Sequence, residues 1–325
     1  MKLINSSFEI LEQEPGLQGI YKQIELAGRT CYKSLDKITK DSAKDFVDRM
    51  INSKHYAMLE HGTVYLLFSR CCYDRHDGEF IDKYIGNPYS KVVYIGTDDN
   101  LVEQTLGKEN YLGDILDTGV YGNALYTITT NYRVLVENGW LNDLQYLCEP
   151  TEYHEKRVTV RFTTSNSIMR EFTRHRSHSF AVESTRYCNY SKNKFNNEIQ
   201  CVIPSWCKNM VNENSYNWEL VHDYNIRQTE GLSEVEARLI MSWCYSEAHY
   251  LMLTNKGILT AQQAREVLPL ATKCDMVMTG FVSDWKHLFR LRTSFIAETG
   301  KPHPDMSNLC DPLYKEFIKR GFIEK

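Results

Sequence analysis

The sequence predicts an α/β protein with a single domain. Apolar residues recur at helical spacing near both ends of the chain, whereas 63–68 and 158–165 carry the β-branched or alternating pattern of strands. The 325 residues contain no internal repeat, low-complexity tract or Gly/Ser linker that would divide them. We therefore expect one α/β domain over 1–325 with an elaborated middle.

Two helices open the chain. The segment 16–33 is predicted to be helical because one face collects Leu17, Ile20, Ile24 and Ala27. A second helix is expected to begin at Thr39 as N-cap and to bury one side formed by Phe46, Val47, Met50 and Ile51.

Strands follow in the middle of the chain. A polar turn with His55, Glu60 and His61 leads into a predicted strand over Thr63–Phe68. Residues 70–155 are less regular, with strand-like runs KVVYIG and ALYTITTNYRVLV and a helical run NDLQYLCE. The alternating segment 158–165 is predicted to be a half-buried strand.

The last hundred residues are predicted to be helical. Ser233 and Glu236 form a capping box that starts a helix ending near Gly257. A short helix begins at Thr260, with Gln263 as its capping-box partner, and stops before Pro269. A third is expected after Ser283 and up to Gly300, and its apolar stripe is Trp285, Leu288, Arg292 and Phe295.

Composition excludes some classes of protein. The formal charge is −4, so the chain has no basic excess of the kind that binds nucleic acid or anionic membranes. No run approaches the roughly 20 apolar residues of a membrane span, and no signal peptide precedes the acidic N-terminal segment, so we expect a cytoplasmic protein. The 10 cysteines form no CxxC pair and no zinc spacing, which predicts reduced thiols and no metal.

The stretch TRHRSHSFAVESTRYCNY, 173–190, concentrates arginines and hydroxyls. Arg174, Arg176 and Arg186 each offer a fork of donors to phosphate oxygens, and Ser184 adds a hydroxyl. A solvated basic loop is the alternative, but such loops usually contain lysine, and here none occurs before Lys192. The composition favours an anion site for a phosphorylated small molecule.

Arg292 is the most informative single residue. A guanidinium in a core-facing stripe loses hydration and cannot deprotonate, so it needs an anion or several acceptors. An internal salt bridge or a surface position is the alternative, and the same choice applies to Arg265 on its short helix. His55, His61 and His175 could carry protons or hydrogen-bond a heterocycle, and the alternative for each is a structural polar group. No glycine-rich nucleotide fingerprint occurs.

These residues resemble a known family. Arg174-His175-Arg176 followed after seven residues by Ser184 resembles the RHRx7S signature of flavin-dependent thymidylate synthases (ThyX). Four more segments resemble that family in the same order: 27–32 (AGRTCY), 55–61 (H-x4-EH), 264–269 (AR-x2-LP) and 289–292 (FRLR). Residues 70–155 would then be an insertion in a single ThyX-like catalytic domain.

The resemblance implies an activity. Members of the family convert dUMP to dTMP with methylene-tetrahydrofolate as carbon donor and FADH2 as hydride donor, which NADPH regenerates. The resemblance also implies an antiparallel-rich sheet with long helices and no Rossmann fold, and a homotetramer whose subunits share active sites. The expected partners are these small molecules, with neither nucleic acid nor membrane.

The resemblance also assigns roles to single residues. Arg292 and Ser184 would be catalytic, Arg292 at the uracil ring and Ser184 in positioning and activation. The dUMP contacts would be Glu171, Arg174, Ser184, Arg186, Arg265 and Arg292. The FAD contacts would be His55, Glu60, Arg174, His175, Arg176 and His287.

Departures from the family pattern keep other functions open. Ala181-Val182 stands where Asn-Glu is usual, with Glu183 displaced by one residue, and Glu171 stands where glutamine is common. One alternative is a flavoprotein on this scaffold with altered nucleotide chemistry. A second is an RNA or single-stranded DNA binding module that uses the arginines with Tyr187 and Tyr190, which the acidic net charge disfavours.

Overall fold

The computed structural model describes residues 1–71, 75–96, 123–218, 230–298 and 300–324. These residues form two compact units, which are described separately. The first unit contains Met1–Leu11, Ala27–Lys37 and Thr159–Lys325, and the second contains Glu12–Leu26 and Ile38–Val158. The helix α1 (Gly16–Cys31) contributes its last residues to the first unit and the others to the second.

A four-stranded sheet organises the first unit, in the order β2-β6-β9-β7. β2 (Ser7–Leu11) pairs antiparallel with β6 (Arg157–Ser165), and β7 (Ser179–Val182) pairs antiparallel with β9 (Lys273–Phe281). β9 lies between β6 and β7 and is buried along most of its length.

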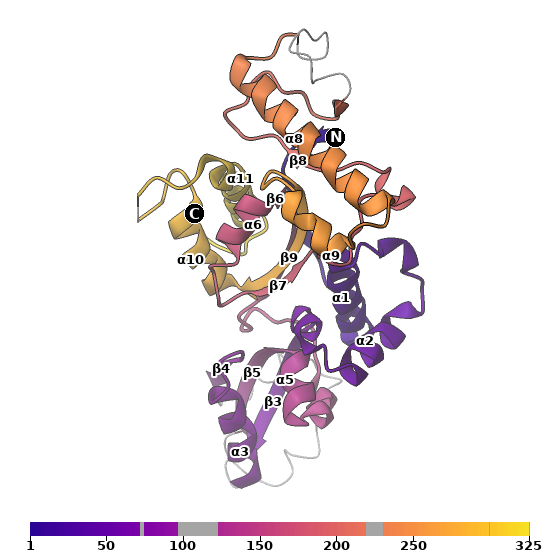
Figure 1. The fold of residues 1–325 in the computed structure, drawn as a ribbon. Helices are drawn as coiled ribbons and strands as arrows, with labels where there is room; N and C mark the ends of the chain where they lie inside the picture. The colour runs from indigo at the N-terminus through magenta and orange to yellow at the C-terminus, as the bar shows by residue number, and fades with distance from the viewer. Residues whose placement is uncertain (72–74, 97–122, 219–229, 299, 325) are drawn as a thin grey trace. The chain divides into compact units, whose positions relative to one another are not determined.

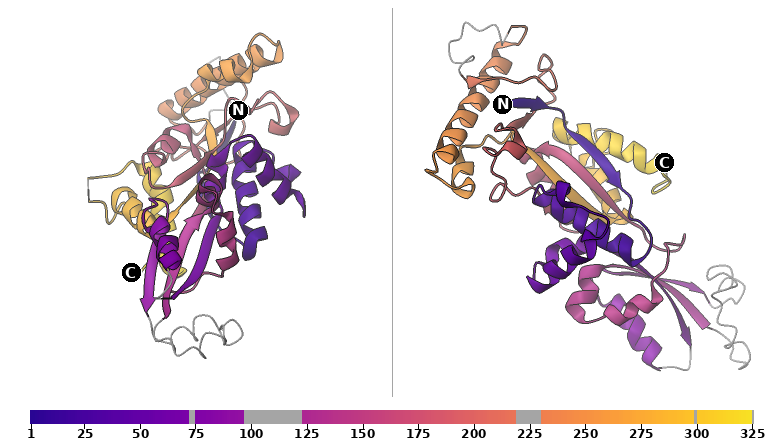
Figure 2. Two further views of the ribbon diagram at one scale, coloured as in Figure 1. Left: turned by 90° about the horizontal axis from the view of Figure 1, so that it is seen from below. Right: turned by 90° about the vertical axis from the view of Figure 1, so that its right-hand side faces the viewer.

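Helices lie on both sides of these strands (Figures 1 and 2). α6 (Asn166–Phe172), α10 (Val282–Arg292) and α11 (Pro304–Lys319) gather on one side, where α11 packs against the other two. Their shared core is aromatic and fully buried, and it contains Phe162, Phe172, Trp285, Phe289 and Phe317. This packing fixes the ends of α6 and α10, which carry candidate site residues.

The other side of the strands carries the long helix α8 (Glu234–Asn255), followed by α9 (Ala261–Ala264) and the 3-10 turn η7 (Arg265–Val267) (Figure 1). α8 buries Ile240, Trp243 and Tyr250 in a cluster with Leu3. The short strands β1 (Lys2–Ile4) and β8 (Gln200–Val202) pair in parallel, and two 3-10 turns, η1 (Leu35–Lys37) and η5 (Asn193–Phe195), complete the unit.

The second unit is built on a three-stranded antiparallel sheet in the order β3-β5-β4. Its strands are β3 (Thr63–Cys71), β4 (Lys91–Gly96) and β5 (Asn123–Asn131). Its helices are α2 (Ser42–Asn52), η2 (Tyr56–His61), α3 (Arg75–Ile85), α5 (Tyr132–Asn138) and η4 (Leu141–Tyr146). The predicted insertion at 70–155 falls in this unit, and its residues 72–74 and 97–122 lie outside the described residues.

The fold class is confirmed: helices combine with antiparallel sheets. The capping boxes at Ser233 and Thr260 are present as predicted, and Gly257 adopts φ +62 just beyond the end of α8. The predicted strands over 63–68 and 158–165 lie within β3 and β6. Local sequence determines these features, because each rests on neighbouring residues alone.

Several predictions of secondary structure are wrong. The last hundred residues are not all helical, because 273–281 is the strand β9. Thr39 is not the N-cap of the second helix; the hydroxyl of Ser42 accepts the N–H of Thr39, and the N-cap is Asp41. The run ALYTITTNYRVLV is not strand throughout, because Asn131 caps α5 with its side chain.

The third C-terminal helix ends at Arg292 rather than at Gly300, and it starts from Phe281 rather than Ser283. At its end, the N–H of Ser294 bonds the carboxylate of Asp311 on α11 at 2.8 Å, which draws the chain away from the helix axis. Phe295 therefore leaves the predicted apolar stripe and is half exposed. Trp285 and Leu288 are buried as predicted.

Candidate functional site

Arg292, the last residue of α10, is held by two predicted site residues. Its Nη1 donates to Oε2 of Glu171 at 2.9 Å, and its Nε donates to Nε2 of His175 at 3.1 Å. The side chains of Arg292 and Glu171 are 22% and 30% exposed, so the ion pair lies at the edge of the core. The structure thus brings Arg292 to two residues that lie 117 and 121 positions earlier in the sequence.

The sheet explains this meeting. β6 leads directly into α6, whose N-cap Ser165 accepts the N–H of Ile168, and β9 leads directly into α10. β6 and β9 are antiparallel neighbours, with Thr159 opposite Thr279 and Thr163 opposite Asp275, so α6 and α10 leave the sheet at opposite ends and their C-terminal ends meet. Glu171 near the end of α6 then faces Arg292 at the end of α10, 121 residues away.

His178 fixes the turn that carries the Arg174-His175-Arg176 motif. Its ring is 6% exposed and lies edge-on to Trp285 of α10, with centroids 4.8 Å apart. A Cβ at Gly280 would lie 2.3 Å from this ring, so only glycine leaves room for it. The turn is therefore anchored from behind, and Arg174 and Arg176 on it are exposed.

His175 is neutral at pH 7. Burial, the positive charge of Arg292 and the nearby His287 together lower its pKa to about 4, and burial is the largest of these causes. Because the arginine can only donate, Nε2 of His175 accepts and its proton is on Nδ1. The ring of His287 lies 6.4 Å from that of His175, centroid to centroid, on an exposed face of α10.

Several hydrogen-bond donors near Arg292 have no partner within the described residues. Among the residues the structure describes, Nη2 of Arg292 has no hydrogen-bond partner, and the side chains of Arg174 and Arg176 have neither a hydrogen bond nor an ion pair. These guanidinium groups are available to an anionic or carbonyl-bearing ligand.

A second group of predicted residues surrounds Arg265. A cavity of about 420 Å³ is lined by Arg265 and Thr185 together with Asn166, Arg170, Glu266 and residues 268–270. Arg265 contacts Glu266 only at 3.7 Å, so most of its donors are open. Arg186 is exposed and donates from Nε to Gln262 at 3.0 Å. The guanidinium groups of Arg170 and Arg265 and the hydroxyl of Thr185 all line this cavity, and such a set of donors suits a phosphate group.

Ser184 is partly buried, and its backbone is held by its neighbours. Its N–H donates to the carbonyl of Cys31 at 3.1 Å, and its own carbonyl accepts from Cys188 at 2.9 Å. Its hydroxyl has no hydrogen-bond partner in the described parts of the chain, so no base beside it makes it a nucleophile. Glu183, just before it, is buried and bound to Lys33 and Lys273.

His55 and Glu60 belong to the second unit. His55 is exposed at the start of η2, and Glu60 forms an ion pair with Arg133. The carbonyl of Glu60 accepts from Nη1 of Arg157 at 3.0 Å. His61 is fully buried. The FAD roles of His55 and Glu60 stay predictions.

Sequence reasoning missed several residues at these sites. Arg170 shares a helical face with Asn166, four residues away, but α6 was not predicted, so nothing placed it. The tertiary fold brings Lys33 and Lys273 to Glu183, and no local sequence pattern identifies them as its partners. Arg133 and Arg157 both contact Glu60. Arg133 lies within the irregular segment 70–155, and Arg157 lies two residues beyond it.

No group of three or more His, Cys, Asp or Glu side chains that could hold a metal occurs among the described residues. The described helices include none that is long and apolar enough to cross a membrane. The eight cysteines with described side chains are unbridged, and most of them are buried.

Known proteins resemble this chain in sequence. The family model "Thymidylate synthase complementing protein" matches residues 150–320, about half of the chain. The "Probable flavin-dependent thymidylate synthase" of Paramecium bursaria Chlorella virus 1 is 30% identical over 162 residues, which cover 49% of this chain and 67% of that protein.

Solved structures resemble the chain loosely. A UMP/dUMP methylase PolB from Streptomyces cacaoi, bound with 5-Br dUMP, has a TM-score of 0.40 and 13% identity over 98% of this chain and 93% of its own. Thymidylate Synthase X (ThyX) from Helicobacter pylori, with FAD and dUMP, has a TM-score of 0.37 and 13% identity over 95% and 92%.

The family model covers the arginine motif, Ser184, the Arg265 segment and α10, where the structure gathers Glu171, His175 and Arg292. The two N-terminal segments that resemble the family, 27–32 and 55–61, lie outside the matched residues. Because the match spans half of the chain and includes these motifs, the chain belongs to the thymidylate synthase complementing protein family, the flavin-dependent thymidylate synthases.

Proposed function

We propose that this protein converts dUMP to dTMP, with methylene-tetrahydrofolate as carbon donor, FADH2 as hydride donor and NADPH as the reductant that regenerates it. One observation carries the proposal within this family: Arg292 is fixed by Glu171 and His175 while its Nη2 remains open. A guanidinium held in this way is prepared to bind a carbonyl oxygen of the pyrimidine.

Arg292 is the group we assign to the uracil ring. Its Nη1 and Nε are already bound, so the plane of the guanidinium is set before any ligand arrives. A cation whose direction is fixed stabilises negative charge that develops on a pyrimidine oxygen without reorganising first. Neutral His175 supports this arrangement, because a charged imidazole beside Arg292 would repel it.

The cavity at Arg265 is the site we assign to the phosphate of dUMP. Arg170 and Arg265 present guanidinium groups there, and Thr185 presents a hydroxyl. Arg186 lies on the same segment as Thr185 and adds a further exposed fork of donors. Ser184 is assigned to positioning the nucleotide. Glu171 is the counterion of Arg292, so any contact it makes with dUMP would be shared with that arginine.

The flavin is assigned to the exposed side of the motif. The donor set fits it, because Arg174 and Arg176 are exposed cations without partners in the described chain and His287 is exposed beside His175. Such groups suit the pyrophosphate and the polar edge of FAD. We extend the FAD assignment to His55 and Glu60 on the resemblance of their segment alone. When bound, the flavin supplies the hydride, and the chain's residues bind and orient it.

We further propose a homotetramer whose subunits share active sites. Light scattering of the purified protein should give the mass of four chains. Mixing two inactive variants, Arg292→Ala and Ser184→Ala, and allowing subunits to exchange should restore activity, because some sites would then combine two intact segments. Activity that stays absent in verified mixed tetramers contradicts the sharing of sites.

Turnover is the test of the proposed function. The purified, FAD-loaded protein is incubated with dUMP, methylene-tetrahydrofolate and NADPH, and dTMP is measured by chromatography, with a control that lacks the folate. Product that requires the folate supports the synthase. Oxidation of NADPH without dTMP would favour a flavoprotein with altered nucleotide chemistry, the alternative that Ala181-Val182 keeps open.

A further inference from the structure

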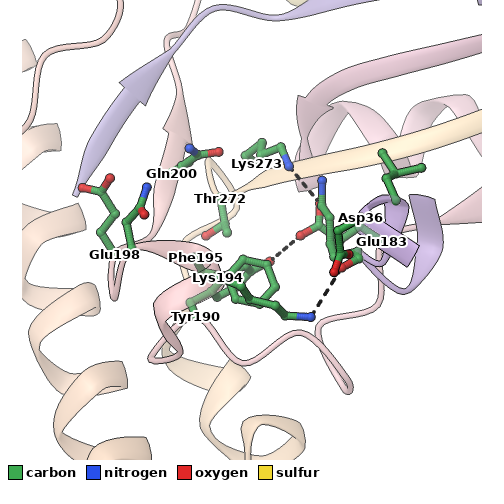
Figure 3. A pocket seen from close by; sticks show the side chains of 12 residues that line it. Asp36, Glu183, Tyr190, Lys194, Phe195, Glu198, Gln200, Thr272 and Lys273 are labelled. Atoms are coloured by element: carbon green, nitrogen blue, oxygen red, sulfur yellow. Dashed lines mark hydrogen bonds and ion pairs between the residues drawn. The ribbon is translucent and has the colours of Figure 1, made fainter. Parts of the chain in front are cut away.

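A buried ionic cluster lies directly before Ser184. Oε2 of Glu183 accepts from Nζ of Lys33 at 3.2 Å and from Nζ of Lys273 at 3.1 Å, and it also accepts the backbone N–H of Asp275 at 3.0 Å. Oε1 accepts from the hydroxyl of Tyr190 at 3.2 Å. Figure 3 shows Lys273 and Tyr190 reaching Glu183 from different sides. The Glu183 side chain is 1% exposed, so these partners replace water completely.

Asp275 closes the cluster. Its carboxylate pairs with both lysines, at 2.8 Å to Lys273, and accepts from Thr163 at 2.7 Å. Burial alone would raise the pKa of Asp275, but the two lysines outweigh burial and hold this pKa below its ordinary value. The cluster therefore contains two cations and two anions that satisfy one another.

The one-residue displacement of the glutamate explains its partners. Residues of a strand alternate between its two faces, so a carboxylate moved from position 182 to 183 changes face. β7 pairs with β9 up to Val182 opposite Met276, and the N–H of Glu183 then donates to the carbonyl of Asp275 at 2.8 Å. Glu183 thereby meets Lys273 of β9 rather than the face occupied by Val182.

Ion pairs rather than dense packing hold Glu183 in place. The cluster forms one wall of a cavity of about 450 Å³, which is also lined by Phe195, Gln200 and Thr272 (Figure 3). Open space therefore adjoins the carboxylate of Glu183 on that side. The position of Glu183 therefore depends on Lys33 and Lys273.

The same segment that holds Glu183 also holds Ser184. Lys33 contributes its ammonium group to Glu183, and Cys31, two residues earlier, contributes its carbonyl to the N–H of Ser184. The side chain of one residue and the backbone of the next are thus tied to the end of α1. From there the chain passes directly to Thr185 and Arg186.

We propose that Glu183 is a positioning residue for the nucleotide: through Lys33 and Lys273 it fixes Ser184, Thr185 and Arg186 from behind, without touching the substrate. This inference rests on the proposed function, because it assigns these three residues to dUMP. It also gives the displaced glutamate a role that differs from ligand binding.

The test compares two substitutions in one cluster. Glu183→Gln keeps the shape, and its amide oxygen can still accept the N–H of Asp275 while its NH2 donates to the Tyr190 hydroxyl, but it removes the charge that both lysines bind. It should raise the KM for dUMP at least about tenfold, while the FAD absorbance spectrum stays unchanged and kcat changes less than about threefold. Glu183→Asp should recover part of the loss.

Asp275→Asn is the matched control. It removes a charge from the same cluster but leaves the side-chain partners of Glu183 in place, so the thermal midpoint should fall while the KM for dUMP stays within about twofold. An equal rise of KM in both variants would mean that the cluster only stabilises the fold, and would overturn the inference. If Glu183→Gln does not fold, Lys33→Gln is the substitute, with the same expected rise of KM.

The wild-type protein separates the two proposals. Wild-type protein that makes no dTMP contradicts the proposed function. The inference is then judged by equilibrium binding of dUMP to wild-type protein and to both variants, and equal affinities contradict it.

Discussion

The Arg292 group and the Glu183 cluster both contain ion pairs, the first at the ends of helices α6 and α10 and the second at the end of β7 beside β9, but they differ in what they leave open. In the Glu183 cluster two lysines meet two carboxylates, and Tyr190 and Thr163 satisfy the remaining oxygens. In the Arg292 group one carboxylate and a neutral histidine leave Nη2 unbound in the described structure. Spare donor capacity is what a ligand can use, whereas a saturated cluster can only hold its neighbours in place.

The largest effect is expected at the open group. Arg292→Ala should lower dTMP formation by about 10³-fold or more, because the fixed cation at the pyrimidine is lost, while FAD remains bound. Turnover measures the loss of dTMP formation, and the flavin absorbance spectrum measures whether FAD remains bound. Arg290→Ala is the control, since Arg290 lies on the same helix but is exposed and pairs with Glu298. Retained turnover in Arg292→Ala would show that the spare donor of Arg292 is not used by the substrate, and the proposed difference between the Arg292 group and the Glu183 cluster would then fail.

At the saturated cluster the effect should be on stability. Lys273→Met leaves two buried carboxylates with one lysine, which should cost about 3–5 kcal/mol in the free energy of unfolding. Burial lowers the pKa of Lys273, but Glu183 and Asp275 outweigh it and raise this pKa, so the lysine is charged in the folded protein. Urea unfolding followed by circular dichroism measures the change. A loss under about 1 kcal/mol would show that the cluster is not the tightly coupled unit described above.

The neutral histidine of the open group predicts acid sensitivity. The folded-state pKa of His175 is about 4, below the ordinary value of 6.5, so between these values the unfolded chain binds the proton first. Its contribution to stability is complete above pH 6.5 and falls as the pH drops toward 4, by about 2 kcal/mol at pH 5. His175→Gln should lose correspondingly less between pH 7.5 and pH 5 in urea titrations.

His154 in the second unit should account for part of the remaining acid sensitivity. Burial lowers its pKa to about 4 as well, against the opposing hydrogen bond to the carbonyl of Leu66. An unchanged pH dependence in His175→Gln would mean that His175 is not held neutral by its surroundings.

The smallest effect is expected from Tyr190→Phe. This change removes one hydrogen bond to Glu183 but leaves both lysines and the aromatic ring, so the free energy of unfolding should fall by about 1–2 kcal/mol. The KM for dUMP should stay within about twofold, because the charges still fix Glu183. A KM that rises as far as in Glu183→Gln would show that Tyr190 rather than the ion pairs fixes Glu183.

Local signals in the sequence were sufficient for several elements of the fold. The capping boxes at Ser233 and Thr260 need only residues three apart, and β6 is visible as an alternating strand. β9 was missed because its central run, Met276 to Met278, is apolar on both faces, and such a run does not distinguish a strand from a helix. The end of α10 was missed because Asp311 on another helix determines it.

The sequence by itself identified Arg292 as an arginine in an apolar stripe, along with the arginine motif and Ser184, because each is a matter of residue type and spacing. Only the tertiary structure decided that Glu171 and His175 hold Arg292, and that Glu183 turns toward Lys33 and Lys273. The reason is physical: ion pairs and pKa values depend on distance and burial, and these arise when neighbouring strands bring distant segments together.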